Sequence, residues 1–400
     1  MVYHLATHSY SIDRYYELKP DTEFGRLGRA DATAAFRSLL EDSVKLRLRA
    51  DVTVGTCLSG GLDSSAMSGL AAREYHAAAG QKFTGIHAKS VERRSDESAM
   101  ARIVADHLDI RLTVVEPTTE DFVRTIDEVV YTQEEPFGSP SMFMGWHVFQ
   151  EAKAQNCKVM LNGQGGDEVL LGYERYFAAL LRTISAGQFL RELWLQSRNS
   201  QLSFVGVLQF YLYFTRPDLR IRRLKARSRL RPHIVETHDF EYVRRSAESF
   251  RDVTDLQTLE ISTLQLPHLL RYEDRNSMRH SIETRLPFLD FRVVEAAIAM
   301  PADYKIHAGW TKHVLRKSIE DVLPSSVVWR KNKLGFEAPE NTWLSAYEEE
   351  MKGEIGRSQI LAEIADVPRI LEEFRRLSLK ERWAYFNLAA WERIYNVSWA

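Results

Sequence analysis

The chain has 400 residues, of which 44% are hydrophobic and 27% charged, and its formal net charge is −2. This length gives a soft expectation of two domains, with ample chain for a large core. The near-neutral charge argues against a general affinity for nucleic acid or for an anionic membrane. Its two cysteines, Cys57 and Cys157, are too few for a disulfide framework, so they favour a cytoplasmic protein with small buried thiols.

The start of the chain carries no basic region followed by an apolar one, so no secretory signal is expected. Residues 1–30 are polar and predict a lead-in segment packed on the surface. The longest apolar run, residues 202–214, is too short to span a bilayer and predicts a buried helix.

Helical and strand-like patterns alternate between residues 31 and 175. Strands are expected over residues 52–58, 83–88, 111–115 and 158–161, and helices over 31–48, 65–75, 96–108, 120–131 and 141–154. This alternation predicts an α/β fold with a parallel sheet and helices on both faces. After Tyr173 the strand signals fade, so a mostly helical region is expected over residues 176–400.

A glycine-rich loop, SGGLDSS at residues 59–65, stands between the first expected strand and its helix. Glycines let the backbone approach an anion closely, and the amides and dipole at a helix start favour negative charge. Asp63 would repel phosphates unless a divalent cation lay between them, so it predicts a magnesium ligand. The loop lacks the lysine of a Walker motif, and its pattern is that of the PP-loop, which grips the pyrophosphate end of ATP. The alternative is a turn that binds nothing, which the flanking strand and helix make the weaker reading.

A second glycine-rich loop, NGQGGDE at residues 162–168, directly follows the expected strand at 158–161. In open α/β sheets, ligands bind beyond the carboxyl ends of the strands. Both loops occupy such positions, so we expect them to share one site.

Four segments together resemble the synthetase domain of asparagine synthetases. They are LSGGLDSS (58–65), LNGQGGDEVLLGY (161–173), DRNSMRHSIETRLPFLD (274–290), and TKHVLR (311–316) with RKNKLGFEAP (330–339). The first segment alone is also similar to NAD synthetases and argininosuccinate synthetases, and the later ones separate the chain from those. The resemblance covers residues 33–343 and is weakest over 175–255. It implies that ATP and magnesium serve to adenylate a carboxylate, usually the aspartate side chain, and that ammonia or another amine then displaces AMP.

The resemblance also implies roles for single residues. Asp63 and Asp167 would hold magnesium, and Lys312 would neutralise charge on the polyphosphate. The alternative for Lys312 is a solvated lysine at the start of a helix over residues 311–319. The residues expected to line the nucleotide are Cys57, Leu58, Ser59, Gly60, Gly61, Leu62, Asp63, Ser64, Ser65, His87, Asn162 and Gly163.

Gln164 departs from the pattern, because many relatives carry an acid there that assists the acyl-adenylate chemistry. Glutamine hydrogen-bonds but does not accept a proton at neutral pH. Glu168, Asp167 or a substrate phosphate must then supply the base. Gln164, Asp167, Glu168 and Lys312 are therefore the expected catalytic residues.

Three charged groups outside the loops have competing interpretations. Arg330, Lys331 and Lys333 form a cationic cluster that could hold pyrophosphate or simply lie on the surface. The series Asp274, Arg275, Glu283 and Arg285 predicts a buried ion-pair network. The basic stretch 220–231 is consistent with a nucleic-acid patch, but it favours a solvated face or a contact with a partner's acidic surface.

Glutamine-dependent relatives begin with a glutaminase domain, for which this chain leaves no room before its sheet. We expect free ammonia, another amine or a separate glutaminase subunit as the nitrogen source, unless the chain is a fragment. A homodimer is left open. The main hypothesis is asparagine formation, with a related amide-forming or ring-closing synthetase as the alternative. A non-catalytic nucleotide-binding or partner-binding protein is the third, and the presence of Asp63, Asp167 and Lys312 argues against it.

Overall fold

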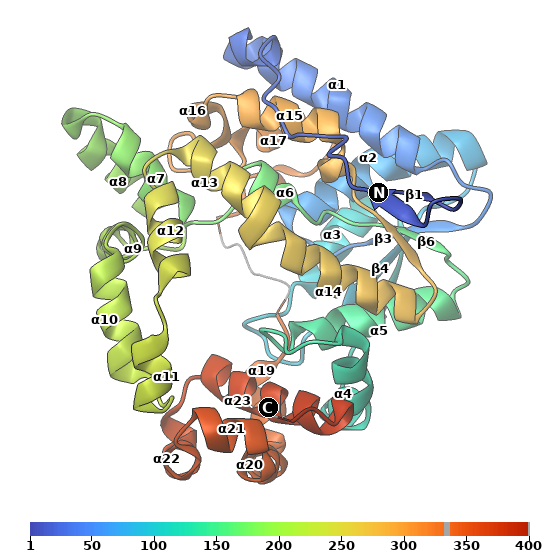
Figure 1. Cartoon of the computed structure of the whole chain (residues 1–400). Helices are drawn as coiled ribbons and strands as arrows, with labels where there is room; N and C mark the ends of the chain where they lie inside the picture. Colours follow the sequence, from blue (N-terminus) through green and yellow to red (C-terminus); the bar gives the residue numbers. More distant parts are fainter. Residues whose placement is uncertain (332–336, 399–400) are drawn as a thin grey trace.

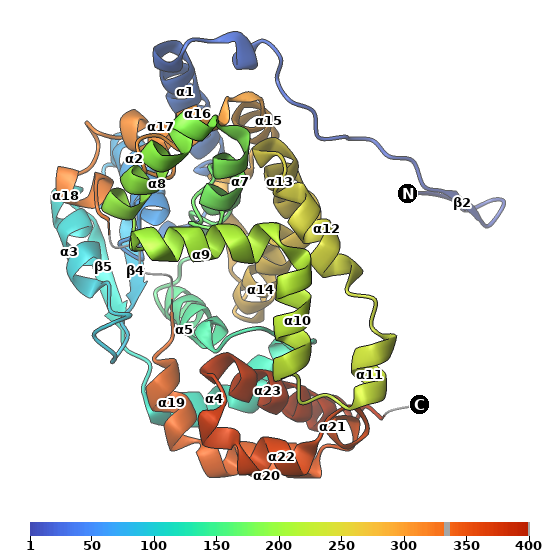
Figure 2. The same ribbon diagram turned by 90° about the vertical axis from the view of Figure 1, so that its left-hand side faces the viewer.

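The computed structural model describes residues 1–331 and 337–398 (Figure 1). Its N-terminal arm is a small antiparallel hairpin of β1 (Val2–His4) and β2 (Ser9–Ser11). Figure 2 shows this hairpin standing clear of the body of the molecule, and residues 1–17 are exposed. The expectation that residues 1–30 pack on the surface is therefore wrong for the hairpin. Contact with the body begins at Tyr16, whose hydroxyl donates to Glu295, and includes the buried Phe24.

A five-stranded parallel sheet forms the centre of the described chain, in the order β5-β4-β3-β6-β7. The strands are β3 (Val54–Cys57), β4 (Thr84–Ala88), β5 (Arg111–Val115), β6 (Val159–Leu161) and β7 (Glu283–Arg285). The first four confirm the strands expected from the sequence. β7 was not predicted, because it is only three residues long and carries charged side chains at both ends.

Helices cover both faces of the sheet, which confirms the predicted fold class. Figure 1 shows α1 (Arg29–Arg47) and α2 (Leu62–Ala79) on one side, with α5 (Ser141–Ala154) and α14 (Leu266–Arg279) on the other. Strand β6 shows how the side chains divide, since Val159 and Leu161 enter the core beneath α1 and α2. Met160 points the opposite way into the core shared with α5. This alternation is the period of two expected of a buried strand.

The remaining helices complete the layers around the sheet and build the C-terminal half. Those before residue 176 are α3 (Ser98–His107), α4 (Thr119–Gln133) and α6 (Gly166–Val169). Those of the middle region are α7 (Tyr176–Thr183), α8 (Ala186–Asn199), α9 (Phe204–Thr215), α10 (Pro217–Arg227), α11 (Pro232–Thr237), α12 (Glu241–Ser249) and α13 (Val253–Leu259). Those after β7 are α15 (Phe291–Ala299), α16 (Ala302–Lys305), α17 (His313–Ser318), α18 (Ser325–Val328), α19 (Glu340–Ala346), α20 (Glu348–Arg357), α21 (Gln359–Ile364), α22 (Val367–Glu372) and α23 (Leu379–Tyr395). Short 3-10 or π turns lie at Phe24–Arg26, Glu260–Leu264, Pro287–Leu289 and Phe374–Arg376.

Two expectations for the helical half are wrong. The apolar run at 202–214 forms α9, but this helix buries only Val207 fully and leaves Phe204, Val205 and Leu212 exposed. One stripe of α9 packs on α7 and α8, so its other side faces outward. No helix in the described residues is both long and apolar enough to cross a membrane.

The predicted buried network at residues 274–285 is also not formed. Asp274 is exposed, and the Glu283 side chain that pairs with Arg285 is 61% exposed. Arg275 instead contacts Glu134 and Glu135 before α5. The charges of this segment therefore lie near the surface, because only every third or fourth side chain of α14 faces the core.

The strand order explains where a ligand site can form. The chain runs outward from β3 to β4 and β5, and then returns to place β6 on the other side of β3. The direction of winding reverses between β3 and β6. Loops that leave adjacent strands at such a switch point diverge and leave a crevice beyond the carboxyl ends. The two glycine-rich loops leave these two strands.

Candidate active site

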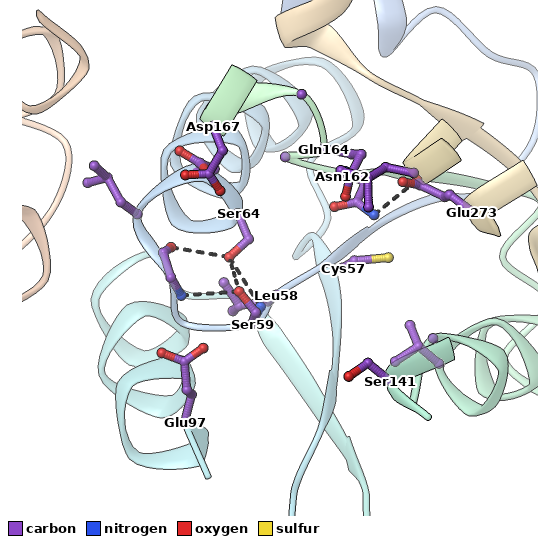
Figure 3. Close-up of a pocket in the computed structure, with 18 of the residues that line it drawn as sticks. Cys57, Leu58, Ser59, Ser64, Glu97, Ser141, Asn162, Gln164, Asp167 and Glu273 are labelled. Carbon is purple, nitrogen blue, oxygen red and sulfur yellow. Dashed lines mark hydrogen bonds between the residues drawn. The ribbon is translucent and has the colours of Figure 1, made fainter. Parts of the chain in front are cut away.

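A cavity of about 380 Å³ lies at the switch point and is lined by both glycine-rich loops (Figure 3). Its walls are completed by α5, α14 and the segment before α17. From the first loop it takes Ser59, Gly61, Leu62, Asp63 and Ser64, and from the second Asn162, Gly163, Gln164, Gly165, Asp167 and Glu168. Residues more than a hundred positions apart in the sequence therefore share one concave surface.

The first loop is organised by its own serines. The Ser59 and Ser64 hydroxyl oxygens lie 2.8 Å apart, and the Gly61 amide donates to Ser59 Oγ over 3.1 Å (Figure 3). α2 begins at Leu62, three residues before the predicted start, so Asp63 and Ser64 belong to its first turn. No side chain caps this helix. Its N-terminal end, with its partial positive charge, faces the cavity and suits an anion.

The second loop touches the first through its glycines. A Cβ at Gly163 would lie 2.8 Å from the Asp63 carbonyl carbon and from the Ser64 nitrogen, closer than real Cβ atoms approach. A side chain at this position would therefore push the loops apart. This contact explains why the second loop needs a glycine there.

Lys312 is buried between the loops, with 4% of its side chain exposed. Its ammonium forms a short ion pair with Asp63 and lies 2.8 Å from Asp167 Oδ1. The interpretation of Lys312 as a solvated lysine is wrong, and the helix predicted over 311–319 is the shorter α17, His313–Ser318. Gly172 makes room for this arrangement, since a Cβ there would lie 2.0 Å from both Asp167 Oδ1 and Lys312 Cε.

The neighbouring carboxylates keep the Lys312 side chain protonated. Burial alone lowers the pKa of the Lys312 ammonium, but Asp167 and Asp63 outweigh burial and hold that pKa above its ordinary value. The lysine is therefore charged at neutral pH. Its positive charge lies between the Asp63 and Asp167 carboxylates at the wall of the cavity.

The two carboxylates fit a magnesium ion. Asp63 and Asp167 already contact one common cation, so their oxygens converge. Within residues 1–331 and 337–398, no group of three or more His, Cys, Asp or Glu side chains could hold a metal by itself. Magnesium commonly takes one or two protein carboxylates and completes its shell with water and substrate phosphates, which this pair allows.

Glu168 is fully buried, next to Asp167. Burial, followed by the neighbouring Asp167, raises the pKa of Glu168 to about 7, although the hydrogen bond from the Tyr173 hydroxyl opposes the rise. The Tyr173 oxygen lies 2.6 Å from Glu168 Oε1. A carboxyl group with a pKa near neutrality can both give and take a proton under working conditions.

Most, but not all, of the residues expected to line the nucleotide line the cavity. Gly60, Ser65 and His87 do not line the cavity, whereas the others do. Both His87 ring nitrogens are engaged inside the protein, one with the Leu58 carbonyl oxygen at 2.9 Å and the other with Ser98 Oγ at 3.2 Å. Burial lowers the pKa of His87. Cys57 is half-buried and lines the cavity, and Cys157 is buried in the core.

The predicted cationic cluster is divided by the fold. Arg330 lines the cavity and its Nη1 lies 2.8 Å from the buried Glu97 carboxylate, which also lines it. Lys331 is exposed. Lys333 lies outside the described residues.

Two further lining residues, Glu273 and Asn276, were missed by the sequence analysis. They lie one helical turn apart on α14, inside or next to the recognised 274–290 segment. Asn162 Nδ2 donates to Glu273 Oε1 over 3.0 Å, which links the second loop to α14 (Figure 3). The charged residues Asp274 and Arg275 stand between these two positions in the sequence, but the spacing of 273 and 276 marks one helix face.

Replacing Glu273 with glutamine is expected to make stability less dependent on pH. Burial raises the pKa of Glu273 to about 7, with the Asn162 hydrogen bond opposing and Asp274 adding to the rise. The folded protein therefore keeps this proton up to pH 7, whereas the unfolded chain loses it near its ordinary value. Stability consequently falls as pH rises between these two values and stays low above them. Glu273→Gln should stabilise the protein by about 2–3 kcal/mol more at pH 8 than at pH 5.

Urea denaturation of the variant and the parent at both pH values measures this difference. Glu363→Gln is the matched control, because Glu363 is an exposed glutamate of α21. An equal effect of Glu273→Gln at pH 5 and pH 8 would contradict the assignment of the buried proton to this residue.

Comparisons with known proteins agree with the geometry of the cavity. The sequence profile named Asparagine synthase matches residues 35–393. The chain is a member of the asparagine synthase family. Among its relatives is a Mycobacterium tuberculosis (strain H37Rv) protein that bears the name of a glutamine-hydrolysing asparagine synthetase. It is 31% identical over an alignment that covers 96% of this chain and 61% of the relative.

Proteins of lower identity are also similar to this chain. Asparagine synthetase 1 of Bacillus subtilis is 28% identical over 77% of this chain and 50% of its own length. The amidase chry2 of Gibberella zeae is 24% identical over 82% of this chain and 56% of its own length. The chain thus spans about half to three-fifths of the length of these three relatives.

Proposed function

We propose that this chain is an ATP-dependent amide synthetase that adenylates a carboxylate and transfers ammonia to it. The aspartate side chain is the first candidate substrate, with asparagine, AMP and pyrophosphate as products. One observation carries the proposal: the buried ammonium of Lys312 contacts Asp63 of the first loop and Asp167 of the second in a single cavity. A site that gathers a helix N-terminus, a cation and convergent carboxylates suits a magnesium nucleotide.

The proposed reaction has two steps, adenylation of the carboxylate and formation of the amide. A carboxylate oxygen of the substrate attacks the α-phosphorus of ATP, and the bond from that phosphorus to the bridging oxygen breaks, so pyrophosphate leaves. The nitrogen of ammonia then attacks the acyl carbon, the bond from carbon to the AMP oxygen breaks, and the nitrogen gives up a proton. The amide and AMP are formed, and no oxidant or reductant is needed.

Named side chains serve each step. Lys312 neutralises charge on the phosphates, and the first turn of α2 orients them. A magnesium ion, when bound, would screen the charge that gathers on the phosphate oxygens, and Asp63 and Asp167 would hold it. Many relatives carry an acid at the position of Gln164. In this chain Glu168, whose pKa is about 7, accepts the proton of the attacking nitrogen instead. Gln164 lines the cavity and donates or accepts hydrogen bonds there.

The proposal also assigns a role to each half of the chain. Residues 31–175 would bind the nucleotide and residues 176–400 would complete the synthetase region, in a protein acting in the cytoplasm. Free ammonia, another amine or a separate glutaminase subunit would supply the nitrogen. The oligomeric state is left open, and the mass of the protein in solution would show whether it forms a homodimer. No membrane and no nucleic acid take part.

A second candidate is a related synthetase acting on another carboxylate and amine, including ring closure. Gln164 in the cavity and the similarity to proteins named amidases favour it over a non-catalytic role.

A screen of carboxylates for stimulated pyrophosphate release distinguishes these candidates. With ATP and magnesium present, aspartate is expected to stimulate release, and ammonia should then yield equal amounts of asparagine and AMP. Mass analysis with and without ammonia identifies the product. Stimulation by a different carboxylate would favour the second candidate, and release indifferent to every carboxylate would contradict both.

A further inference from the structure

A second cavity, of about 880 Å³, lies between the α9–α10–α11 region and helix α23. Figure 2 shows α10 descending from α9 towards α23, with α11 beside it. This cavity shares no lining residue with the active-site cavity. Its volume is within the range of small-molecule sites.

The two sides of this cavity are tied together by backbone contacts. Leu230 forms a β-bridge with Ala365, and the Arg231 amide donates to the Ile364 carbonyl oxygen over 2.9 Å. Arg229 adds ion pairs with Glu373 at 2.8 Å and Glu381 at 3.2 Å. The loop after α10 is therefore fixed to the C-terminal helices, and the cavity is a built feature.

Arg220 lines this cavity, and no described acidic side chain forms an ion pair with it. Its guanidinium carbon lies 5.2 Å from the centre of the Tyr213 ring and 5.8 Å from that of Phe214. Its Nε and Nη1 atoms are buried and have no hydrogen-bond partner. The Arg220 side chain as a whole is only partly buried. Its two shielded donors without partners are costly, and an anion that reached them would relieve that cost.

The rest of the wall is positive and apolar. Arg223, Lys225 and Arg227 also line it, whereas Glu381 is its one acidic residue among those described. Because Glu381 is paired with Arg229, it does not compensate Arg220. Aromatic and aliphatic side chains, Phe210, Phe240 and Tyr385 among them, cover much of the remaining surface.

We propose that this cavity is a binding site for an organic anion, a carboxylate or phosphate group carried on an aromatic or alkyl body. The planar guanidinium of Arg220 matches the two oxygens of such a group. The apolar wall would receive the body, which a simple inorganic anion lacks. This site explains part of the basic stretch at 220–231, whose other members Arg222 and Arg223 are solvated as the sequence analysis favoured. The inference does not rest on the proposed function, because binding here requires no turnover.

Equilibrium dialysis with three probes that share one ring system tests the site. The probes are 2-naphthoate, 2-naphthyl phosphate and the neutral 2-naphthol. We expect the full chain to bind at least one anion more tightly than 2-naphthol. Arg220→Gln should weaken that anion about 10- to 100-fold, the range for lost charge-assisted hydrogen bonds, and leave 2-naphthol unchanged. Whichever anion binds more tightly identifies the head group as carboxylate or phosphate.

Two further variants keep the test decisive. Arg222→Gln is the matched control, since Arg222 is exposed on the same helix and does not line the cavity. It should change no affinity. Arg223→Gln, which removes an exposed lining charge, should weaken the anion about two- to fivefold and remains informative if Arg220→Gln fails to fold by circular dichroism. Equal binding of 2-naphthol and the anions, equal effects of the Arg222 and Arg220 or Arg223 variants, or no binding at millimolar probe would each overturn the proposal.

Discussion

Lys312→Met is expected to lower carboxylate-dependent pyrophosphate release about a thousandfold, the scale of a lost transition-state charge partner. In the parent the ammonium is buried against Asp63 and Asp167, so it is preorganised where phosphate charge develops. Methionine keeps the length and apolar stem but removes the charge. Initial rates of pyrophosphate release at saturating ATP measure the loss.

The same change is expected to destabilise the protein by about 3–5 kcal/mol, because it leaves two carboxylates without their shared cation. Adding Asp167→Asn to Lys312→Met restores the original net charge of the site. We expect this double variant to regain much of the stability and none of the activity. That separation distinguishes a chemical role of Lys312 from a purely structural one.

Lys317→Met is the matched control, since Lys317 is exposed on α17, the helix that begins directly after Lys312, and pairs only with Glu320 among the described acids. It should keep the parental rate. If Lys312→Met kept more than about a tenth of the parental rate, a transition-state contribution of several kcal/mol would be excluded. Recovery of both stability and activity in the double variant would point to a structural role.

Local patterns explain which parts of this molecule the sequence could predict. The SGGLDSS loop is flanked by a strand and a helix, and its Ser59 and Ser64 hydroxyls bond within the loop itself, so its form could be inferred from a few residues. The α5 boundaries and the strand at 111–115 were also predicted, since their patterning agrees with their final environment. Likewise, the positions of the two loops followed from the rule for parallel sheets.

Features that depend on distant partners were not predicted. β7 has no strand pattern of its own and is ordered by pairing with β6, as Val159 aligns with Glu283. The burial of Lys312 depends on the bare backbone at Gly172, which no local pattern announces. Glu273 is acidic and stands next to charged residues in the sequence, yet its position on α14 directs its side chain towards the cavity. α9 looked like a core helix, but the elements available to cover it shield only one side.

These failures have a common physical cause. Hydrophobic periodicity reports how much of a residue's surface prefers burial, and it does not say which neighbour will provide that burial. A charged residue such as Lys312 or Glu273 becomes buried only where partners from other segments meet it. The family resemblance therefore located Lys312, whereas Glu273, just outside the recognised segment, emerged only from the structure.

Glu168→Gln is expected to lower amide formation about 10²- to 10⁴-fold while adenylation persists, because a general base contributes on that scale. The carboxylate form of Glu168 is the one that accepts a proton, and its pKa is about 7. At a fixed concentration of unprotonated ammonia, amide formation by the parent should therefore rise with pH through this value and level off above it. In the variant, the amide group cannot titrate, so the remaining rate should lose this rise. Exchange of labelled pyrophosphate into ATP reports the first step, and product mass reports the second.

Tyr173→Phe provides the sharper companion to that experiment. The Tyr173 hydroxyl donates to Glu168 and holds its pKa down against burial and Asp167. Without this hydrogen bond the pKa of Glu168 should rise further, and the pH profile of amide formation should move to higher pH with its plateau largely kept. A structural role of the pair would lower the rate at every pH without moving the profile. An unmoved profile in Tyr173→Phe, together with an unchanged rise in Glu168→Gln, would assign the base to another group, of which Asp167 and a substrate phosphate are the remaining candidates.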